Sequence, residues 1–316
     1  MRLQSFYDGN GWLQVGAQVE GRVLTHPDWA DDLSGVFESG FEDYIAQLRS
    51  VIASGTAVEA TPARPAPAIP SPGKIVCIGL NYRAHAVEQG IEPPDRPLLF
   101  AKFANTVVAD GEPIVRPTGT RALDLEAELG VVIGRRAHHV RAADAMVHVA
   151  GYVVVNDVTA RDWQGNKAAL GPGERGDGQW LRAKGSDTFF PIGPVFVTAD
   201  EFDGPPDLPI RSWRIPGAGP DAGRAIPMQD ATTGDLVFGI PELIEYVSRF
   251  ITLDPGDIIS TGTPSGVGVF RDPPVYLEPG DRVRVEIEGI GSVENPVIDW
   301  SEATVVADDE PTPRRD

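Results

Sequence analysis

The chain has 316 residues, of which 41% are hydrophobic and 23% charged, so it can build one large folded core or a core with a smaller appendage. Its formal net charge of −19 repels the phosphates of nucleic acids and anionic membrane surfaces, which argues against either as the main partner. A single cysteine, Cys77, excludes a disulfide framework and a thiolate metal site, and we expect it to pack inside an apolar strand.

The N-terminal part of the chain contains one clear helical segment and one extended segment. Residues 42–52 carry apolar side chains at helical spacing, and Gly55 follows as a stop signal, so we predict a helix there. Residues 56–73 are rich in alanine and proline, which is typical of an extended connector. We therefore predict a small N-terminal domain at residues 1–55, followed by this connector.

The larger unit, residues 74–300, contains many short predicted strands. Its frequent glycines and prolines interrupt runs rich in Val and Ile, a pattern that favours strands joined by turns. Helices are fewer, with Pro241 in the first turn of one at 241–250 and a short one at 142–150. The clearest strands are 129–133, 151–155, 257–260 and 282–288. These patterns predict a β-rich α+β fold, which ends in an acidic, disordered tail at 301–316.

Acidic residues cluster before one apolar strand. If this segment forms one continuous strand, Asp124, Glu126 and Glu128 share a face, because side chains alternate with a period of two. Like charges on one face repel each other and resist burial, so either water solvates them or a cation neutralises them. Asp157 follows the next strand and could add a ligand. Spacing alone leaves a metal site and a solvated surface both open, and an all-oxygen ligand set suits Mg²⁺, Mn²⁺ or Ca²⁺.

A histidine and a glutamate form a second candidate pair. Residues 82–89 could be helical, and a spacing of three places His85 and Glu88 on one face. A carboxylate that contacts an imidazole fixes its tautomer and raises its basicity, which suits the activation of water. An isolated pair with this spacing is more typical of a helix surface.

Several motifs in a fixed order favour the metal site and the catalytic pair. Together they resemble the fumarylacetoacetate hydrolase family over about residues 72–300. They are Gly-Leu-Asn-Tyr-Arg-Ala-His at 79–85, Glu-Ala-Glu at 126–128, Asn-Asp-Val-Thr-Ala-Arg-Asp at 156–162, Lys-Gly-Ser-Asp-Thr-Phe at 184–189 and Leu-Asp-Pro-Gly-Asp-Ile-Ile-Ser-Thr-Gly-Thr-Pro at 253–264.

The resemblance implies a fold and a metal site. The fold would be a mixed β-sheet roll with few helices, here preceded by a short N-terminal domain and commonly dimeric. Glu126, Glu128 and Asp157 would bind Mg²⁺, with Mn²⁺ or Ca²⁺ as alternatives, and Asp124 would either support these ligands or be a structural carboxylate. A catalytically silent scaffold would have lost one of these ligands or Lys184, and none is lost.

The resemblance also implies roles for residues around the metal. His85 and Glu88 would form a catalytic dyad on a mobile lid, and Lys184 would stabilise negative charge that develops on the substrate.

Substrate binding would involve another set of residues. Arg161 and Gln164 would hold the carboxylate and carbonyl oxygens of the substrate. Lys102 and Thr263 would line the site, and Tyr82 would be either a substrate contact or a packing residue.

The implied reaction is metal-dependent hydrolysis of a carbon–carbon bond in an acylpyruvate or fumarylacetoacetate-like 1,3-diketo acid, through a metal-bound enolate, in the breakdown of aromatic compounds. The same site could instead serve a 2-oxo acid decarboxylase, a 2-hydroxymuconate-type isomerase or a 2-keto-3-deoxy sugar acid dehydratase. The sequence lacks a signal-peptide core and any apolar run of membrane-spanning length, so we expect a cytoplasmic location. The resemblance implies a homodimer.

Overall fold

The structure is a computed structural model and describes residues 1–176 and 178–306. Among these residues, twelve strands form one mixed sheet, whose main path runs in the order β4-β3-β2-β1-β14-β12-β11-β17-β6-β7. The strands on this path are β4 (Val58–Glu59), β3 (Arg22–Thr25), β2 (Leu13–Val19), β1 (Arg2–Tyr7), β14 (Phe190–Thr198), β12 (Val149–Asn156), β11 (Ala127–Ile133), β17 (Ile258–Ser260), β6 (Ile75–Gly79) and β7 (Leu98–Lys102). Two short strands, β5 (Arg64–Pro65) and β8 (Val107–Val108), pair with β1 and β14.

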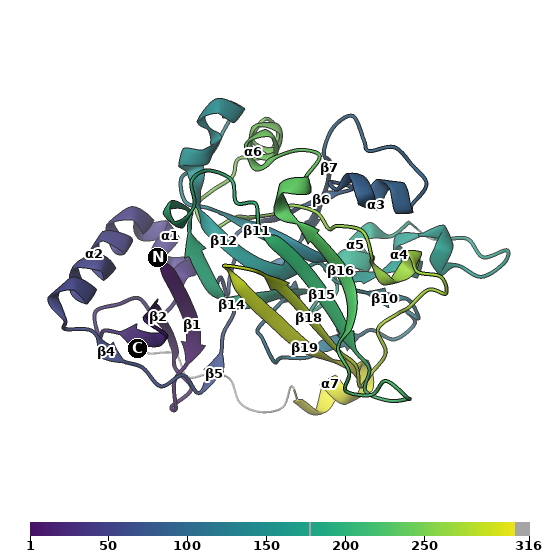
Figure 1. The fold of residues 1–316 in the computed structure, drawn as a ribbon, viewed down its shortest axis with the longest axis horizontal. Coiled ribbons are helices and arrows are strands. Elements are labelled where there is room, and N and C mark those ends of the chain that lie inside the picture. Colours follow the sequence, from purple (N-terminus) through teal and green to yellow (C-terminus); the bar gives the residue numbers. More distant parts are fainter. Residues whose placement is uncertain (177, 307–316) are drawn as a thin grey trace.

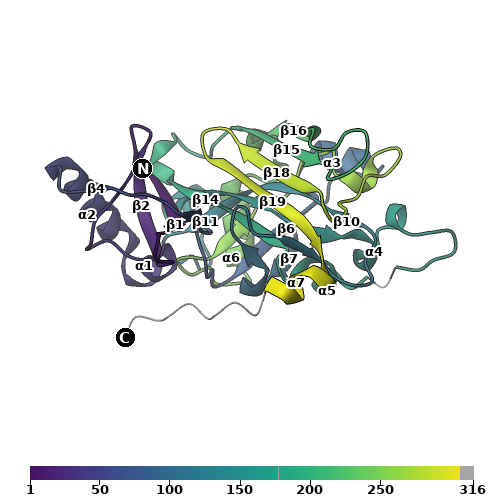
Figure 2. The same ribbon diagram turned by 90° about the horizontal axis from the view of Figure 1, so that it is seen from below.

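A second sheet packs on the first, as Figure 2 shows for β15, β16, β18 and β19. Its strands, in order, are β16 (Ile226–Thr232), β15 (Pro209–Ile215), β18 (Arg282–Ile287), β19 (Gly291–Asp299) and β9 (Ile114–Arg116). A third, two-stranded sheet joins β10 (Leu123–Asp124) to β13 (Thr159–Ala160). The β-rich α+β class predicted from the sequence is therefore confirmed.

Few helices surround the sheets. The α-helices are α1 (Leu33–Ser39), α2 (Phe41–Ser54), α3 (Arg83–Glu88), α4 (Arg161–Gln164), α5 (Trp180–Gly185), α6 (Ile240–Ser248) and α7 (Trp300–Val306). The short 3₁₀ turns are η1 (Ala104–Thr106), η2 (Ala142–His148), η3 (Lys167–Ala169), η4 (Ala199–Glu201), η5 (Thr233–Asp235) and η6 (Gly268–Phe270). None of the helices in the described parts of the chain is long and apolar enough to cross a bilayer.

The central strand β12 is buried on both faces, which explains its unbroken apolar sequence. Val153 and Val155 pack into a core with residues of α1 and α2. Tyr152 and Val154 point the other way, into a core shared with β18, β19 and α6. The period of two in this strand therefore separates two hydrophobic cores.

Three local predictions differ from the structure. Residues 142–148 form the 3₁₀ turn η2 rather than an α-helix, and the chain enters β12 at Val149. The acidic segment is not one continuous strand, since β10 ends at Asp124 and β11 begins at Ala127. The tail from residue 301 begins in α7, and the rest of it lies outside the described residues.

The N-terminal residues share the main sheet. Strand β1 pairs with β14, with Leu3 opposite Phe196, and β4 and β5 of the connector pair with β3 and β1. Figures 1 and 2 place α1, α2 and β1–β4 at one end of the long axis, and α3, α4 and α5 at the other. The domain boundaries at residues 55 and 73 stay predictions from the sequence.

An aromatic cluster fastens this N-terminal unit to the sheet, which leads to a stability prediction. Phe37 is 3% exposed, stacks on Phe41 with a ring-centroid distance of 4.9 Å, and meets Phe196 edge-on at 6.0 Å. We expect Phe37→Ala to lower the free energy of unfolding by about 3–5 kcal/mol, because it leaves a cavity in a packed core. Urea unfolding followed by circular dichroism measures this change.

The control is Phe250→Ala, since Phe250 is 68% exposed and its loss should change the free energy of unfolding by less than about 0.5 kcal/mol. Equal effects of the two substitutions would contradict the packing role of Phe37.

Candidate active site

Three carboxylates converge where β11 and β12 run side by side. The strands are antiparallel, with Ala127 opposite Asn156. Glu126 lies just before β11 and Glu128 is its second residue, so the two flank Ala127. Asp157 is the first residue after β12. One oxygen from each of Glu126, Glu128 and Asp157 lies within 4.8 Å of the others, and all three residues are buried. Such a group of buried acids could hold a metal ion.

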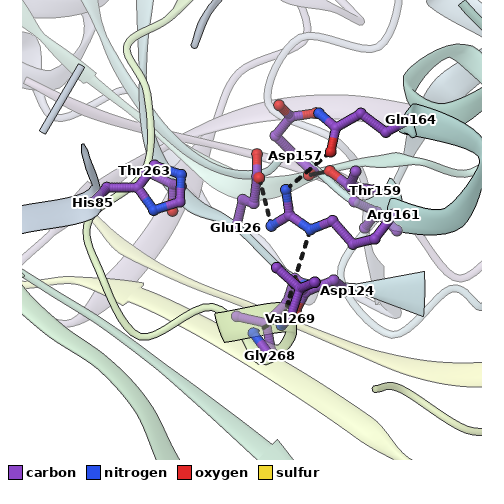
Figure 3. Close-up of polar contacts among 12 residues, drawn as sticks. His85, Asp124, Glu126, Asp157, Thr159, Arg161, Gln164, Thr263, Gly268 and Val269 are labelled. Atoms are coloured by element: carbon purple, nitrogen blue, oxygen red, sulfur yellow. Dashed lines mark hydrogen bonds and ion pairs between the residues drawn. The ribbon is translucent and has the colours of Figure 1, made fainter. Parts of the chain in front are cut away.

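Two buried cations contact Glu126. The Lys184 ammonium lies 2.7 Å from Glu126 Oε2 and 2.6 Å from Asp157 Oδ2. The Arg161 guanidinium lies 2.7 Å from Glu126 Oε1 and donates a hydrogen bond to Asp124 Oδ2 at 2.9 Å. Figure 3 shows Arg161 between Glu126 and Asp124, with His85 on the far side of Glu126 in this view. The cations hold the acids in place, because each is paired with two of them.

Asp124 turns away from the other acids and anchors a loop. Besides Arg161, its carboxylate accepts hydrogen bonds from the backbone amides of Gly268 at 2.8 Å and Val269 at 3.1 Å. Position 268 needs glycine, since a Cβ there would lie 1.9 Å from the Val275 carbonyl oxygen. The shared face predicted for Asp124, Glu126 and Glu128 is therefore limited to the last two.

Lys102 lies behind the site. Its ammonium donates to the backbone carbonyls of Val158 at 2.9 Å, Lys184 at 2.6 Å and Phe189 at 2.7 Å. It is also 2.8 Å from Asp157 Oδ1. An ammonium has three donors, and the carbonyls use all of them, so Asp157 Oδ1 has a cation beside it but no hydrogen-bond donor. This oxygen keeps a lone pair for a metal ion.

The electrostatics of the three carboxylates differ. Burial raises the pKa of Glu126, but the charges of Lys184 and Arg161 outweigh it and bring this pKa down to about 2. Burial and the charges of Asp157 and Glu126 raise the pKa of Glu128 well above its usual value. Burial, followed by the charge of Glu126, also raises the pKa of Asp157 in spite of its lysine neighbours. A hard divalent cation fits here, since it would favour the ionised forms that burial and repulsion oppose.

The His85–Glu88 pair is formed, and a backbone amide holds it. His85 Nδ1 lies 2.5 Å from Glu88 Oε1, and the amide of Gly266 donates to Glu88 Oε2 at 2.8 Å. His85 is only 4% exposed, which excludes the surface-pair interpretation. Both residues belong to α3, which follows β6.

A cavity of about 280 Å³ joins the two groups. Among the residues expected from the sequence, those that line it are His85, Glu126, Glu128, Arg161, Gln164, Lys184 and Thr263. Apolar walls come from Leu80, Leu98, Phe100 and Trp180, and further amides from Gln89 and Asn166. The sequence analysis missed these six. Only Gln89 carried a signal, because it follows His85 by four residues and so shares its helix face.

The remaining expected residues have other surroundings. Gln164 accepts from Arg161 Nη1 at 3.4 Å, which directs its side chain along the guanidinium. The Thr263 hydroxyl donates to the Ala127 carbonyl at 3.0 Å and accepts from Gln229 at 2.7 Å, so it braces β11. Tyr82 is 1% exposed, and the cavity lining does not include it.

Comparison with known proteins places this site in a family. A family model described as fumarylacetoacetate (FAA) hydrolase C-terminal matches residues 74–298. The chain belongs to the fumarylacetoacetate hydrolase family. Members of this enzyme family are typically dependent on a divalent metal.

Relatives within the fumarylacetoacetate hydrolase family carry different activities in their names. A mitochondrial oxaloacetate tautomerase of Bos taurus is 46% identical over 227 residues, which cover 72% of this chain and 67% of the relative. A fumarylacetoacetate hydrolase from Exiguobacterium antarcticum has a similar structure, with a TM-score of 0.75 and 31% identity over 95% of this chain and 99% of that one. A 5-carboxymethyl-2-hydroxymuconate delta-isomerase from Mycobacterium smegmatis also has a similar structure. Its TM-score is 0.67, and it is 30% identical over 95% of this chain and 100% of that one.

Proposed function

We propose that the protein binds Mg²⁺ at Glu126, Glu128 and Asp157 and interconverts the keto and enol forms of a small 2-oxo dicarboxylate, with oxaloacetate as the substrate to test first. The observation that carries this proposal is the buried carboxylate group beside the His85–Glu88 pair in one cavity. The name of the tautomerase from Bos taurus supports the choice of reaction.

The cavity suits a small dianion. Its volume of about 280 Å³ is below the range of about 300–1,000 Å³ that is usual for drug-sized ligands. The net charge of the protein repels an anionic substrate at long range, so local cations must bind it. Arg161 and Lys184 supply them, and both line the cavity.

The proposed proton transfer uses Nε2 of His85, the ring nitrogen that does not contact Glu88. Because Nδ1 is bonded to Glu88, Nε2 is the nitrogen that can exchange a proton with the substrate. Nε2 removes a proton from the carbon next to the 2-oxo group, the C–H electron pair forms the C=C bond, and the C=O π pair moves to the oxygen. The protonated Nε2 then returns a proton to that oxygen. Lys184 stabilises the negative charge on that oxygen. A bound cation supplies Lewis-acid polarisation of the 2-oxo group.

Hydrolysis of an acylpyruvate is the second candidate, supported by the structural similarity to a fumarylacetoacetate hydrolase. There the His85–Glu88 pair would deprotonate a water molecule instead of a carbon. The two reactions share the site and differ in their products.

A substrate comparison tests the proposal. With Mg²⁺, the protein should accelerate the decay of enol oxaloacetate, measured by ultraviolet absorbance and by NMR, and EDTA should remove this effect. We expect His85→Asn to lower the rate by at least about 100-fold, because it removes the general base. The control is His139→Asn, since His139 is exposed and its φ of 52° is one that asparagine tolerates.

Other products would redirect the assignment. Cleavage of an acylpyruvate to pyruvate and a carboxylic acid, with no effect on enol oxaloacetate, would support the hydrolase. Release of carbon dioxide from oxaloacetate would indicate a decarboxylase. A homodimer is a further proposal from the resemblance, which light scattering tests. A cytoplasmic location is a further proposal from the sequence pattern, which cell fractionation tests.

A further inference from the structure

We infer that Gln89 is a positioning residue for His85, whose side-chain amide holds the cavity-facing nitrogen of the imidazole and keeps the ring in the tautomer with a lone pair on Nε2. The inference rests on the proposed function, in which Nε2 exchanges the proton.

Each ring nitrogen of His85 has one side-chain partner. On one side, Nδ1 is bonded to Glu88, which the Gly266 amide fixes in turn. On the other side, Gln89 Nε2 lies 3.0 Å from His85 Nε2. Gln89 is the C-terminal cap of α3, where its backbone amide donates to the Ala86 carbonyl, so its side chain starts one helical turn after His85. Both ring nitrogens are therefore occupied.

The Glu88 side chain is bonded to the backbone of Gly266, which is closely surrounded by other backbone atoms. Gly266 has a φ of 103°, a conformation that side chains with a Cβ rarely adopt. A Cβ there would lie 2.2 Å from the Met228 carbonyl oxygen. Glu88 is thus bonded to a fixed amide, and only the Gln89 side of the ring opens to the cavity.

Donor and acceptor counting assigns the tautomer. The Glu88 carboxylate only accepts, so Nδ1 must carry a hydrogen. In the neutral ring Nε2 is then an acceptor, and the amide NH₂ of Gln89 is its donor. Nε2 has one lone pair, so the Gln89 amide must turn away when Nε2 takes the substrate's proton. Nε2 is then a donor, and the rotated amide offers its carbonyl oxygen. A glutamine can therefore pair with the base before and after proton transfer, which neither a carboxylate nor an ammonium can do.

Two substitutions separate this role from packing. Gln89→Met keeps the length of the side chain and removes both polar groups, whereas Gln89→Glu leaves only an acceptor. The control is Val87→Thr, a near-isosteric change on the same helix at a residue that is 67% exposed. Nitrogen-15 NMR of histidine-labelled, substrate-free protein in EDTA identifies the tautomer of the imidazole. The signals that are absent from the His85→Asn variant belong to His85.

We expect wild type and Val87→Thr to show a protonated Nδ1 and an unprotonated Nε2 for His85. Gln89→Met should shift or broaden these signals and lower kcat about tenfold, the usual effect of one lost hydrogen bond, with KM changed less than about twofold. Gln89→Glu should show both nitrogens protonated at neutral pH and a lower kcat than Gln89→Met.

Wild-type His85 signals and wild-type kcat in Gln89→Met would overturn the inference. So would a lower melting temperature and active fraction with unchanged His85 signals, because that result marks a purely structural role. The NMR measurement needs no substrate. A wild-type protein without activity on oxaloacetate would therefore contradict the proposed function and leave the test of Gln89 intact.

Discussion

Glu128→Gln should weaken Mg²⁺ binding by more than about 100-fold, since loss of a ligand exceeds the effect of losing an outer partner, and should reduce turnover to background. Without metal, the Glu128→Gln variant should be at least as stable as the metal-free wild-type protein. Glu128 has a raised pKa, and an acid whose pKa rises on folding lowers the free energy of unfolding at pH values above its ordinary pKa. Glutamine removes that charge and keeps an oxygen for the Ser260 hydroxyl at 2.5 Å and the Gly262 amide at 2.9 Å.

Calorimetric titration with Mg²⁺ and thermal unfolding in EDTA measure the two effects. Glu20→Gln is the matched control, because the Glu20 side chain is 82% exposed. Unchanged metal affinity in Glu128→Gln would remove Glu128 from the metal site, and a large loss of stability in EDTA would show that its charge is structural instead.

Lys184→Met should affect stability in a way that depends on the metal. The ammonium contacts Glu126 and Asp157 in a buried site, and its loss leaves Arg161 as the neighbouring cation of Glu126 and Lys102 as that of Asp157. We expect a decrease in the free energy of unfolding of about 3–5 kcal/mol in EDTA and a smaller decrease in saturating Mg²⁺, because the cation neutralises the same carboxylates. At saturating Mg²⁺, kcat should still fall by about 100- to 1,000-fold, because the substrate oxygen loses its cation.

Urea unfolding with and without Mg²⁺, together with steady-state kinetics, checks both parts. Lys167→Met is the control, since Lys167 lies near the site but is exposed. An equal loss of stability with and without Mg²⁺ would mean that the ion and the ammonium do not share their carboxylates.

Local patterns in the sequence predicted the parts of the fold that depend on neighbouring residues. The apolar run at 151–155 became β12, and the helical spacing at 42–52 became α2, which ends at Gly55 as expected. Glu126 and Glu128 also point to the same place, because alternation along an extended segment is local geometry. The motif order indicated that Asp157 joins them, which spacing alone left open.

Contacts between distant segments depended on the tertiary structure. Asp124 left the acidic face because the extended segment breaks before β11, where the Glu126 amide bonds to the Asn156 side chain instead of a strand neighbour. The Lys102 ammonium donates hydrogen bonds to three backbone carbonyls that come together only after folding. The motifs implied that Asp124 and Lys102 lie at the site, but local patterns in the sequence did not indicate these contacts.

The sequence by itself determined which residues are acidic, basic or apolar at each turn of a strand or helix, and therefore which chemistry the chain can offer. Only the tertiary structure decided which of these groups meet. Lys184 reaches Glu126 across 58 residues, and the Gly266 amide reaches Glu88 across 178. The physical reason is that periodicity describes the direction of side chains within a few residues, whereas these contacts follow from how strands pair and sheets pack.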